Sequence, residues 1–184
     1  MTSPSRFELA QADQSQLQEI SDLVNSAYRG DSSRQGWTTE ADFMDGLRTD
    51  PKRLASELSA NPSRTILFLR ESSTRAMVGC VFLERFEDEA GVGCYLGMLT
   101  VSPTLQDQGI GRLLLEHAES HAKTAWGASR VTLGVIQLRE SLMAWYERRG
   151  YKKMGKTKPF PYDQLTTDVP LRNDLYFVMF EKQI

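Results

Sequence analysis

The feature that most limits the fold of this chain is an abrupt change of hydrophobic period near its middle. Residues 77–86 and 92–101 are two extended runs, MVGCVFLERF and VGCYLGMLTV, of the kind that forms strands. From 110 to 125 the apolar residues recur at helical spacing instead. Pro103 and the tripeptide GIG at 109–111 separate the two patterns. The sequence therefore predicts a strand, a glycine-bearing loop and a helix in succession.

The remaining apolar patterns alternate between the same two periods. Asp13 with Gln16 resembles a helix capping box, and Asp50 before Pro51 is typical of a helix start. The expected helices are 14–29, one that starts at Asp50 and ends before Asn61, 110–125 and 140–149, with a short one from Thr39 and a loop over 29–37. The expected strands are 6–9, 65–71, 77–86, 92–101, 130–136, 152–156 and 174–182. An antiparallel meander followed by alternating strands and helices predicts an α/β chain.

Length and charge exclude several classes of function. A chain of 184 residues is expected to form a single domain, 1–184. Its 22 Lys and Arg residues against 24 Asp and Glu residues leave no strong basic field, so no nucleic-acid partner is expected. No apolar run reaches the roughly 18 residues of a membrane span, and the opening lacks a signal-peptide pattern. These observations predict a cytoplasmic protein with no membrane partner.

The loop before the helix at 110 has a chemical use. The first amides of a helix have no partner inside it, glycines let a ligand approach the backbone, and the helix dipole favours negative charge. A phosphate-bearing ligand would fit there. A P-loop would need Lys and then Ser or Thr after Gly111, where this chain has Arg112 and Leu113. A dinucleotide fingerprint would need a third glycine where Leu114 stands.

A different pattern does fit these residues. The run QDQGIG at 106–111 contains Q-x-x-G-x-G and lies between L-x-V at 99–101 and a helix. It resembles the acetyl-CoA loop of the GNAT superfamily of N-acetyltransferases, and AWYERRGY at 144–151 is similar to a second segment of that family. The resemblance implies a GNAT-type α/β fold: a mixed, mostly antiparallel sheet of about seven strands with helices on both faces.

The resemblance also implies a reaction, namely direct attack of a primary amine of a small molecule or peptide on acetyl-CoA, the cosubstrate, in a ternary complex. It implies that the pantetheine arm binds as an added strand to the backbone of Leu99, Thr100 and Val101. It implies that the pyrophosphate binds the backbone amides of Gln106, Asp107, Gln108, Gly109, Ile110, Gly111 and Arg112. Tyr146 matches the tyrosine that protonates the departing thiolate in many members, and Gly97 matches a bulge that admits the cofactor.

Two positions depart from the family pattern. Many members have Asn near position 139, where this chain has Arg139, and many carry a glutamate base in the strand that here reads YLGML at 95–99. A base is needed because a lysine-like amine is neutral only about once in a thousand molecules near neutral pH. Glu84, on the strand expected to pair with 92–101, is the candidate catalytic base. A solvated strand carboxylate is the alternative interpretation.

The loops 27–40 and 158–164 are where this family usually builds its acceptor pocket. The candidate substrate-binding residues are Tyr28, Arg29, Trp37, Glu40, Tyr162 and Asp163. Aromatic and acidic groups would suit an amine cation, whereas Arg29 and Arg34 would suit a carboxylate.

Other readings stay open at this level. His117 and His121 lie at helical i, i+4 spacing, but no third ligand follows them, so no metal is implied. The loop would also serve a non-catalytic acyl-CoA-binding module or a transferase of a longer acyl group. The sequence does not fix the oligomeric state, and a homodimer is left open.

Overall fold

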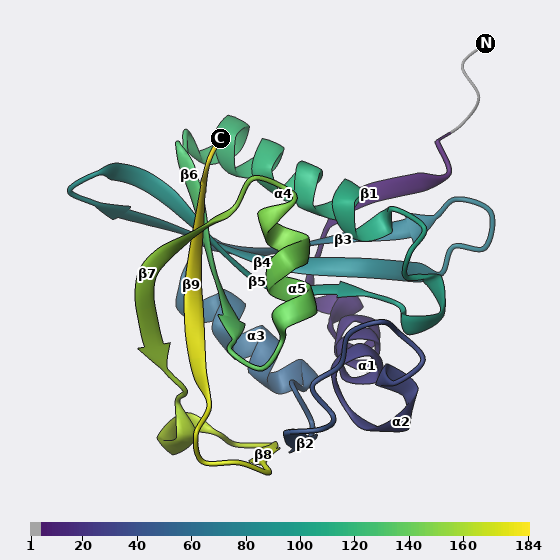
Figure 1. Ribbon diagram of the computed structural model, residues 1–184. Helices are drawn as coiled ribbons and strands as arrows, with labels where there is room; N and C mark the ends of the chain where they lie inside the picture. The colour runs from purple at the N-terminus through teal and green to yellow at the C-terminus, as the bar shows by residue number, and fades with distance from the viewer. Residues whose placement is uncertain (1–4) are drawn as a thin grey trace.

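A seven-stranded mixed sheet forms the centre of the protein (Figure 1). The computed structural model describes residues 5–184, and its main sheet has the strand order β1-β3-β4-β5-β6-β9-β7. The strands are β1 (Phe7–Gln11), β3 (Arg64–Glu71), β4 (Met77–Asp88), β5 (Gly91–Val101), β6 (Arg130–Ile136), β7 (Lys152–Pro159) and β9 (Tyr176–Gln183). Neighbouring strands are antiparallel except β5 and β6, which run parallel. The predicted α/β class with a mixed, mostly antiparallel sheet is confirmed.

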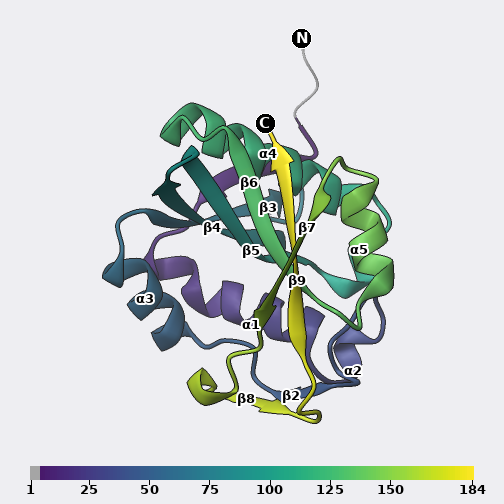
Figure 2. The ribbon, with the colours of Figure 1, turned by 60° about the vertical axis from the view of Figure 1, so that its left-hand side comes forward.

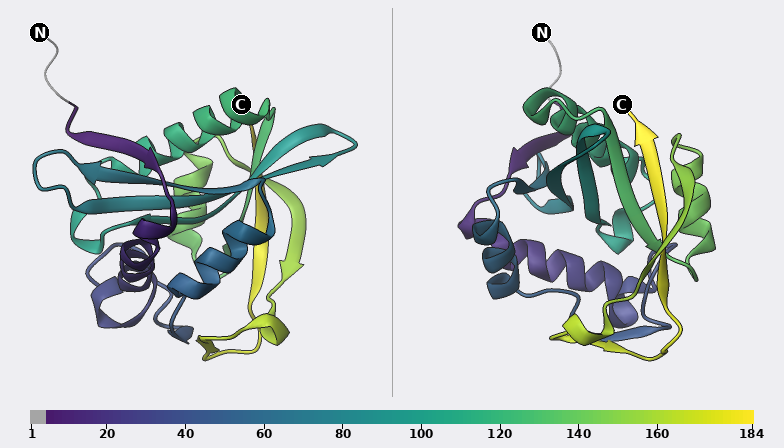
Figure 3. Two further views of the ribbon diagram at one scale, coloured as in Figure 1. Left: turned by 180° about the vertical axis from the view of Figure 1, so that it is seen from behind. Right: turned by 90° about the vertical axis from the view of Figure 1, so that its left-hand side faces the viewer.

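Helices cover both faces of this sheet (Figures 1 and 3). The helices are α1 (Leu17–Tyr28), α2 (Gly30–Ser33), α3 (Pro51–Ala60), α4 (Ile110–Trp126) and α5 (Glu140–Glu147), with 3₁₀ turns at Gln14–Gln16, Pro103–Leu105 and Tyr162–Gln164. Helix α4 lies across one face, and α1 and α3 lie on the other. Within residues 5–184, none of the helices combines the length and the apolar character needed to cross a bilayer.

Strand β3 shows how the sequence builds two cores. Leu67 and Leu69 pack with α4 in one cluster, whereas Ile66 and Phe68 pack with α1 and α3 in another. Successive side chains of a strand point to opposite faces, so an uninterrupted apolar run is required when both faces are covered. The run ILFL at 66–69 therefore supplies apolar side chains to the helices on both faces of the sheet.

The two predicted helix starts have their expected chemistry. Asp13 and Gln16 form a complete capping box, although the first turn is 3₁₀ and α1 begins only at Leu17. The Asp50 side chain accepts a hydrogen bond from the backbone N–H of Arg53 at 2.9 Å, ahead of α3. Side-chain acceptors of this kind satisfy amides that have no partner within the helix.

Two local expectations are wrong. No helix starts at Thr39: its hydroxyl accepts from the N–H of Ala41 at 3.0 Å in a single turn, and the chain then becomes extended. Strand β2 (Met44–Gly46) pairs there with β8 (Asp168–Pro170) in a separate two-stranded sheet, a long-range pairing that overrides local helix preference. The expected loop over 29–37 contains the short helix α2.

The parallel pair β5 and β6 separates soon after it forms (Figure 2). Pairing is limited to Gly93–Tyr95 against Arg130–Thr132, after which the two strands diverge. Strand β5 is also irregular opposite Cys80 and Phe82, where Met98 adopts a positive φ of 52°. An extra residue in one strand bends it away from the ladder. A bulge is therefore present beside the predicted position: Gly97 still pairs with Phe82, and the irregular residues are Met98 and Leu99.

Candidate functional site

A cavity of about 220 Å³ lies where β5 and β6 part, and we call it the inter-strand cavity. Residues 95–99 of β5 and 133–136 of β6 line it on the sheet side. Its other walls come from the end of α1, the segment before β2, the segment from β2 into α3, strands β4 and β9, and α5 with the residue before it. These residues are Tyr28, Glu40, Arg48, Thr49, Arg53, Glu57, Phe82, Arg139, Leu142, Tyr146 and Phe177. The divergence of two parallel strands thus leaves a space that side chains from distant parts of the sequence surround.

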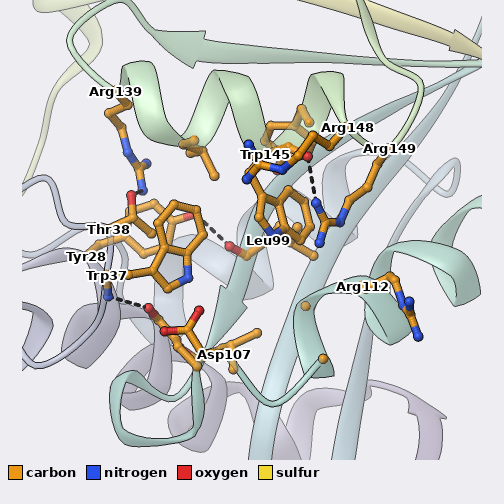
Figure 4. Close-up of a pocket in the computed structure, with 16 residues that line it drawn as sticks. Tyr28, Trp37, Thr38, Leu99, Asp107, Arg112, Arg139, Trp145, Arg148 and Arg149 are labelled. Carbon is orange, nitrogen blue, oxygen red and sulfur yellow. Dashed lines mark hydrogen bonds between the residues drawn. The ribbon is translucent and has the colours of Figure 1, made fainter.

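A second cavity of about 500 Å³ lies beside the glycine-bearing loop, and we call it the loop cavity (Figure 4). It is lined by Gln106, Asp107, Gly109, Gly111 and Arg112, together with Leu99, Val101 and residues of α5. Gly109 has φ of 79° at the N-terminus of α4, a left-handed conformation that favours glycine. The predicted strand-loop-helix arrangement is confirmed, and it opens onto a cavity.

The backbone of this loop offers unused donors. Leu113 donates to the Gly109 carbonyl at 3.0 Å, but the amides of Ile110, Gly111 and Arg112 have no backbone acceptor within residues 5–184. Gln106 fixes the loop from the other side: its Nε2 donates to Val101 O at 3.3 Å, and its Oε1 accepts from Trp37 N at 3.0 Å. The start of α4 is therefore a rigid group of donors suited to an anion.

Cationic side chains surround the same cavity. Arg112, Arg139, Arg148 and Arg149 line it against the single carboxylate of Asp107. The Arg149 guanidinium lies 3.6 Å from the centroid of the Trp145 ring and donates to Trp145 O at 2.8 Å, yet its buried Nε has no partner in the described chain. Burial, together with Arg148 and Arg112, lowers the pKa of Arg149. Like charges held together in this way favour a multiply charged anion.

Tyr146 lies where the two cavities meet. It is 5% exposed, lines both cavities, and packs edge-on against Trp145 and Tyr151. Its hydroxyl makes no hydrogen bond within residues 5–184 and is not a fully enclosed atom, so it opens to the cavities. Burial raises the pKa of Tyr146, and Tyr28 adds to the effect. The phenol is therefore protonated at neutral pH and able to donate.

Glu40 is the centre of a buried ion network. Its carboxylate accepts from Arg29 Nη1 and from Arg139 Nη1, each at 2.7 Å, while Arg29 also binds Asp168. Arg139 further donates to Thr38 Oγ1 at 2.9 Å. Burial opposes the charge of Glu40, but Arg139 and Arg29 hold its pKa below the usual range. Glu40 therefore stays ionised, and it lines the inter-strand cavity with its charge already matched.

The other predicted acceptor residues are divided among different places. Tyr28 lines both cavities and donates from its hydroxyl to Leu99 O at 3.1 Å, and Trp37 lines the loop cavity. Arg29 is buried behind Glu40 and reaches neither cavity. Tyr162 lies outside both and accepts from the backbone N–H of Leu175 at 2.8 Å, and Asp163 lies beside it in the same 3₁₀ turn.

The predicted cofactor residues are also divided. Thr100 is 2% exposed and pairs with Cys80, so it lines neither cavity. Gln108 accepts from Arg6 at 3.1 Å on the surface, and the Ile110 side chain packs in the core beneath α4. Leu99 and Val101 line the loop cavity as the resemblance implied.

Glu84, the candidate base, lies away from both cavities. It pairs across the sheet with Tyr95, but its carboxylate lies 3.2 Å from Arg64 Nε and accepts from Asn61 Nδ2 at 3.1 Å. The structure therefore does not bring Glu84 together with Tyr146. Sequence reasoning missed Arg48, Thr49 and the cavity-lining role of Arg139, because only the tertiary fold brings these residues to one space.

The matching family model is described as the Acetyltransferase (GNAT) family, and it covers residues 17–151. That stretch runs from the first residue of α1 to the residue before β7, so it includes both cavities' main walls. Among curated protein sequences, none matches this chain.

Several solved structures share the fold over nearly the whole chain. A spermidine N-acetyltransferase chimera from Vibrio cholerae and hSSAT is 13% identical with a TM-score of 0.67, covering 97% of this chain and 96% of that chain. A ribosomal-protein-alanine N-acetyltransferase from Escherichia coli is 16% identical with a TM-score of 0.65, covering 97% and 94%. The yncA protein of Salmonella typhimurium, solved with its cofactor acetyl-CoA, is 15% identical with a TM-score of 0.66, covering 97% and 94%.

Proposed function

This chain belongs to the acetyltransferase (GNAT) family, whose members are acyltransferases that use acetyl-CoA, and we propose that it acetylates a primary amine of a small molecule or peptide. The observation that carries the proposal is the junction of two cavities. The loop cavity and the inter-strand cavity share Tyr28, Leu99, Arg139, Leu142 and Tyr146. Two ligands that enter from opposite sides would meet at the Tyr146 hydroxyl, as direct attack in a ternary complex requires.

The loop cavity has the chemistry to hold acetyl-CoA. The free amides of Ile110, Gly111 and Arg112 suit the pyrophosphate, and the arginines of the cavity suit the remaining phosphate charge. The outward backbone of Leu99 and Val101 suits the pantetheine amides in the manner of an added strand. When bound, acetyl-CoA supplies an acetyl thioester, a carbonyl carbon activated toward amines.

In this proposal Tyr146 is the general acid. Its Oη carries a proton whose loss burial disfavours, and the hydroxyl has no competing acceptor in the described chain. A thiolate whose thiol has a pKa near 8.5 accepts a hydrogen bond from a phenol held within reach, and that donor stabilises the negative charge that develops on the departing sulfur. Complete proton transfer from a phenol of higher pKa is uphill, so the donor acts mainly through this hydrogen bond. Position, more than acidity, is what the fold of α5 supplies.

The amine loses its proton without a free carboxylate in the inter-strand cavity. Glu40 is held by Arg29 and Arg139, and Glu57 is paired with Arg53 at 3.0 Å. We therefore propose that water in the cavity carries the proton outward. The alternative base, Glu84, would have to leave Arg64 and Asn61 before it could act.

The test is amine-dependent release of thiol from acetyl-CoA across a panel of primary amines, with the acetylated amine identified by mass. Thiol release that rises with amine concentration and saturates is the expected result. Binding of acetyl-CoA without turnover on any amine would make the chain an acyl-CoA-binding module. Faster turnover with a longer acyl-CoA than with acetyl-CoA would identify that longer acyl-CoA as the donor, and the protein would still be an N-acyltransferase.

Three further expectations belong to the same proposal. We propose that residues 1–184 act as a single catalytic domain and that the protein works in the cytoplasm. The sequence leaves a homodimer open. Light scattering of the purified chain distinguishes monomer from dimer.

A further inference from the structure

Arg48 differs from every other arginine around the inter-strand cavity. It lies between β2 and α3, and its side chain lines the cavity. Arg29, Arg53 and Arg139 each contact a carboxylate within 4 Å. No hydrogen bond or ion pair to the Arg48 side chain occurs within residues 5–184; its guanidinium carbon lies 5.9 Å from the Tyr28 ring centroid.

The next residue adds a second unused donor. Thr49 lines the same cavity and is only 2% exposed. Its hydroxyl is fully enclosed and has no hydrogen-bond partner in the described part of the chain. A buried hydroxyl without a partner loses its hydration and gains nothing in exchange. A ligand oxygen would remove that penalty if the Thr49 side chain turned its hydroxyl toward the cavity.

Helix α1 holds these two donors in place. Asn25 Oδ1 accepts from the backbone N–H of Arg48 at 2.8 Å and from that of Thr49 at 3.3 Å. Asn25 Nδ2 donates to Thr49 O at 2.9 Å, and Ser21 Oγ donates to the same carbonyl at 3.3 Å. The backbone is therefore fixed before any ligand binds, which reduces the entropy lost on binding.

The charges around the cavity leave a positive surplus. Arg48, Arg53 and Arg139 line the cavity against Glu40 and Glu57, and the buried pair of Arg29 and Asp168 behind them adds no net charge. Each of these carboxylates is already bound by at least one of the other three arginines. Arg48 carries the surplus charge: Glu40 and Asp168 act on it from a distance, but neither forms an ion pair with it within residues 5–184. A surplus positive charge is unfavourable for a polyamine in the same space.

We propose that Arg48 and Thr49 form an oxyanion subsite, so that the acceptor is a small amine that also carries a carboxylate. This inference rests on the proposed acetyl transfer. A guanidinium pairs with a carboxylate through two parallel N–H···O bonds, and the Thr49 hydroxyl would supply a third donor once it turns from its enclosed position toward the cavity. The acceptor amine then points toward Leu99 and Tyr146, which line the same cavity. A free amino acid and the carboxyl end of a short peptide share this chemistry.

The experiment compares each carboxylate with its own amide. Amine-dependent thiol release is measured with 4-aminobutyrate and its amide, with glycylglycine and its amide, and with spermidine. Wild type is expected to favour each carboxylate over its amide in kcat/KM, with spermidine the poorest substrate.

Arg48→Gln should reduce that preference about 10- to 100-fold, and Arg48→Lys should reduce it less because the charge remains. Lys52→Gln, on the exposed side of α3 and outside both cavities, is the control of equal charge change.

A second readout does not depend on turnover. The carboxylate should raise the melting temperature of wild type more than its amide does, and Arg48→Gln should abolish this difference. Equal rates for carboxylate and amide in wild type, or an unchanged preference in folded Arg48→Gln, would overturn the subsite while leaving acetyl transfer intact. If no amine releases thiol, the proposed function fails, and the melting comparison alone decides whether the oxyanion subsite exists. Preference for glycylglycine over 4-aminobutyrate would indicate that the carboxylate belongs to the end of a short peptide; the opposite preference would indicate a free amino acid.

Discussion

Arg139 at the start of α5 donates from Nη1 to Oε1 of Glu40 at 2.7 Å, although 99 positions separate the two residues in the sequence. This contact joins the wall shared by both cavities to the segment before β2. Arg139 stands at the position where many family members have an asparagine that contacts the cofactor.

Glu40→Gln should destabilise the protein by about 3 kcal/mol at neutral pH, because Arg139 would lose its buried counter-charge and Arg29 would keep only Asp168. The pKa of Glu40 in the folded protein lies below its ordinary value of 4.5, so this stabilisation is present above pH 4.5. It disappears as the pH falls through the folded-state pKa. Urea unfolding at pH 7 and near pH 4 should therefore show a stability difference between wild type and variant that narrows in acid.

The control for Glu40→Gln is Glu116→Gln. Glu116 pairs with Arg112 on the surface of α4, and both side chains of this pair are exposed. That change should alter stability little, since surface pairs contribute about 0–1 kcal/mol. Equal stability of Glu40→Gln and wild type at neutral pH would mean that the network does not support the fold.

Acetyl-CoA should stabilise the folded chain. At a concentration one hundred times its Kd, a ligand specific for the native state adds about 2.7 kcal/mol, which raises the melting temperature of a protein of this size by about 5–10 °C. A thermal melt with and without millimolar acetyl-CoA measures the shift. Absence of any shift would remove the assignment of the loop cavity to the cofactor.

Gly111→Val should abolish that shift while leaving a folded protein. A Cβ at Gly111 would lie 3.4 Å from Trp145 and 3.5 Å from Val101, which is ordinary contact, so the fold tolerates a side chain there. The two γ-methyl groups of valine would instead occupy the space beside the free amides of α4. Gly111→Ala is the graded control and should weaken binding less, and retention of full affinity in the valine variant would show that the phosphates bind elsewhere.

Tyr146→Phe should reduce turnover and leave stability and acetyl-CoA affinity nearly unchanged, because it deletes a hydroxyl that bonds to nothing in residues 5–184. General acid catalysis typically contributes about 10²- to 10⁴-fold, so a loss of kcat in that range is expected when thiolate departure limits the rate. An acetyl thioester of a more acidic thiol should restore much of the loss. Turnover equal to wild type, with chemistry shown to limit the rate, would make Tyr146 structural.

The elements set by local pattern were predictable, and those set by distant partners were not. The change of period around Pro103 predicted β5, the loop and α4, because glycine positions and apolar spacing are local signals. Strand β2 escaped prediction since its partner β8 lies more than 120 positions away. A three-residue strand has too little sequence to carry a period of its own.

The same division holds at the candidate site. Tyr146 belongs to a local motif, and the structure does place it beside the loop. Arg29 and Glu40 were interpreted as acceptor-pocket residues, but a buried charge needs a counter-charge, and theirs come from Asp168 and Arg139 far along the chain. Arg48 had no sequence signal at all, because what distinguishes it is that its side chain has no hydrogen-bond or ion-pair partner among residues 5–184.

The divergence of β5 from β6 makes the molecule two half-sheets, β1-β3-β4-β5 and β6-β9-β7, joined by a seam of three residue pairs. Arg130 anchors that seam: its side chain binds Asp88 and donates to the carbonyl of Ala90 at 3.0 Å. The seam reaches the inter-strand cavity at Tyr95, which belongs to its last pair, whereas Arg130 lines neither cavity. We expect substitutions at Arg130 to alter the size of acceptor that the inter-strand cavity admits, although Arg130 itself contacts no acceptor. Selection for a different substrate size can therefore act at a residue outside the site.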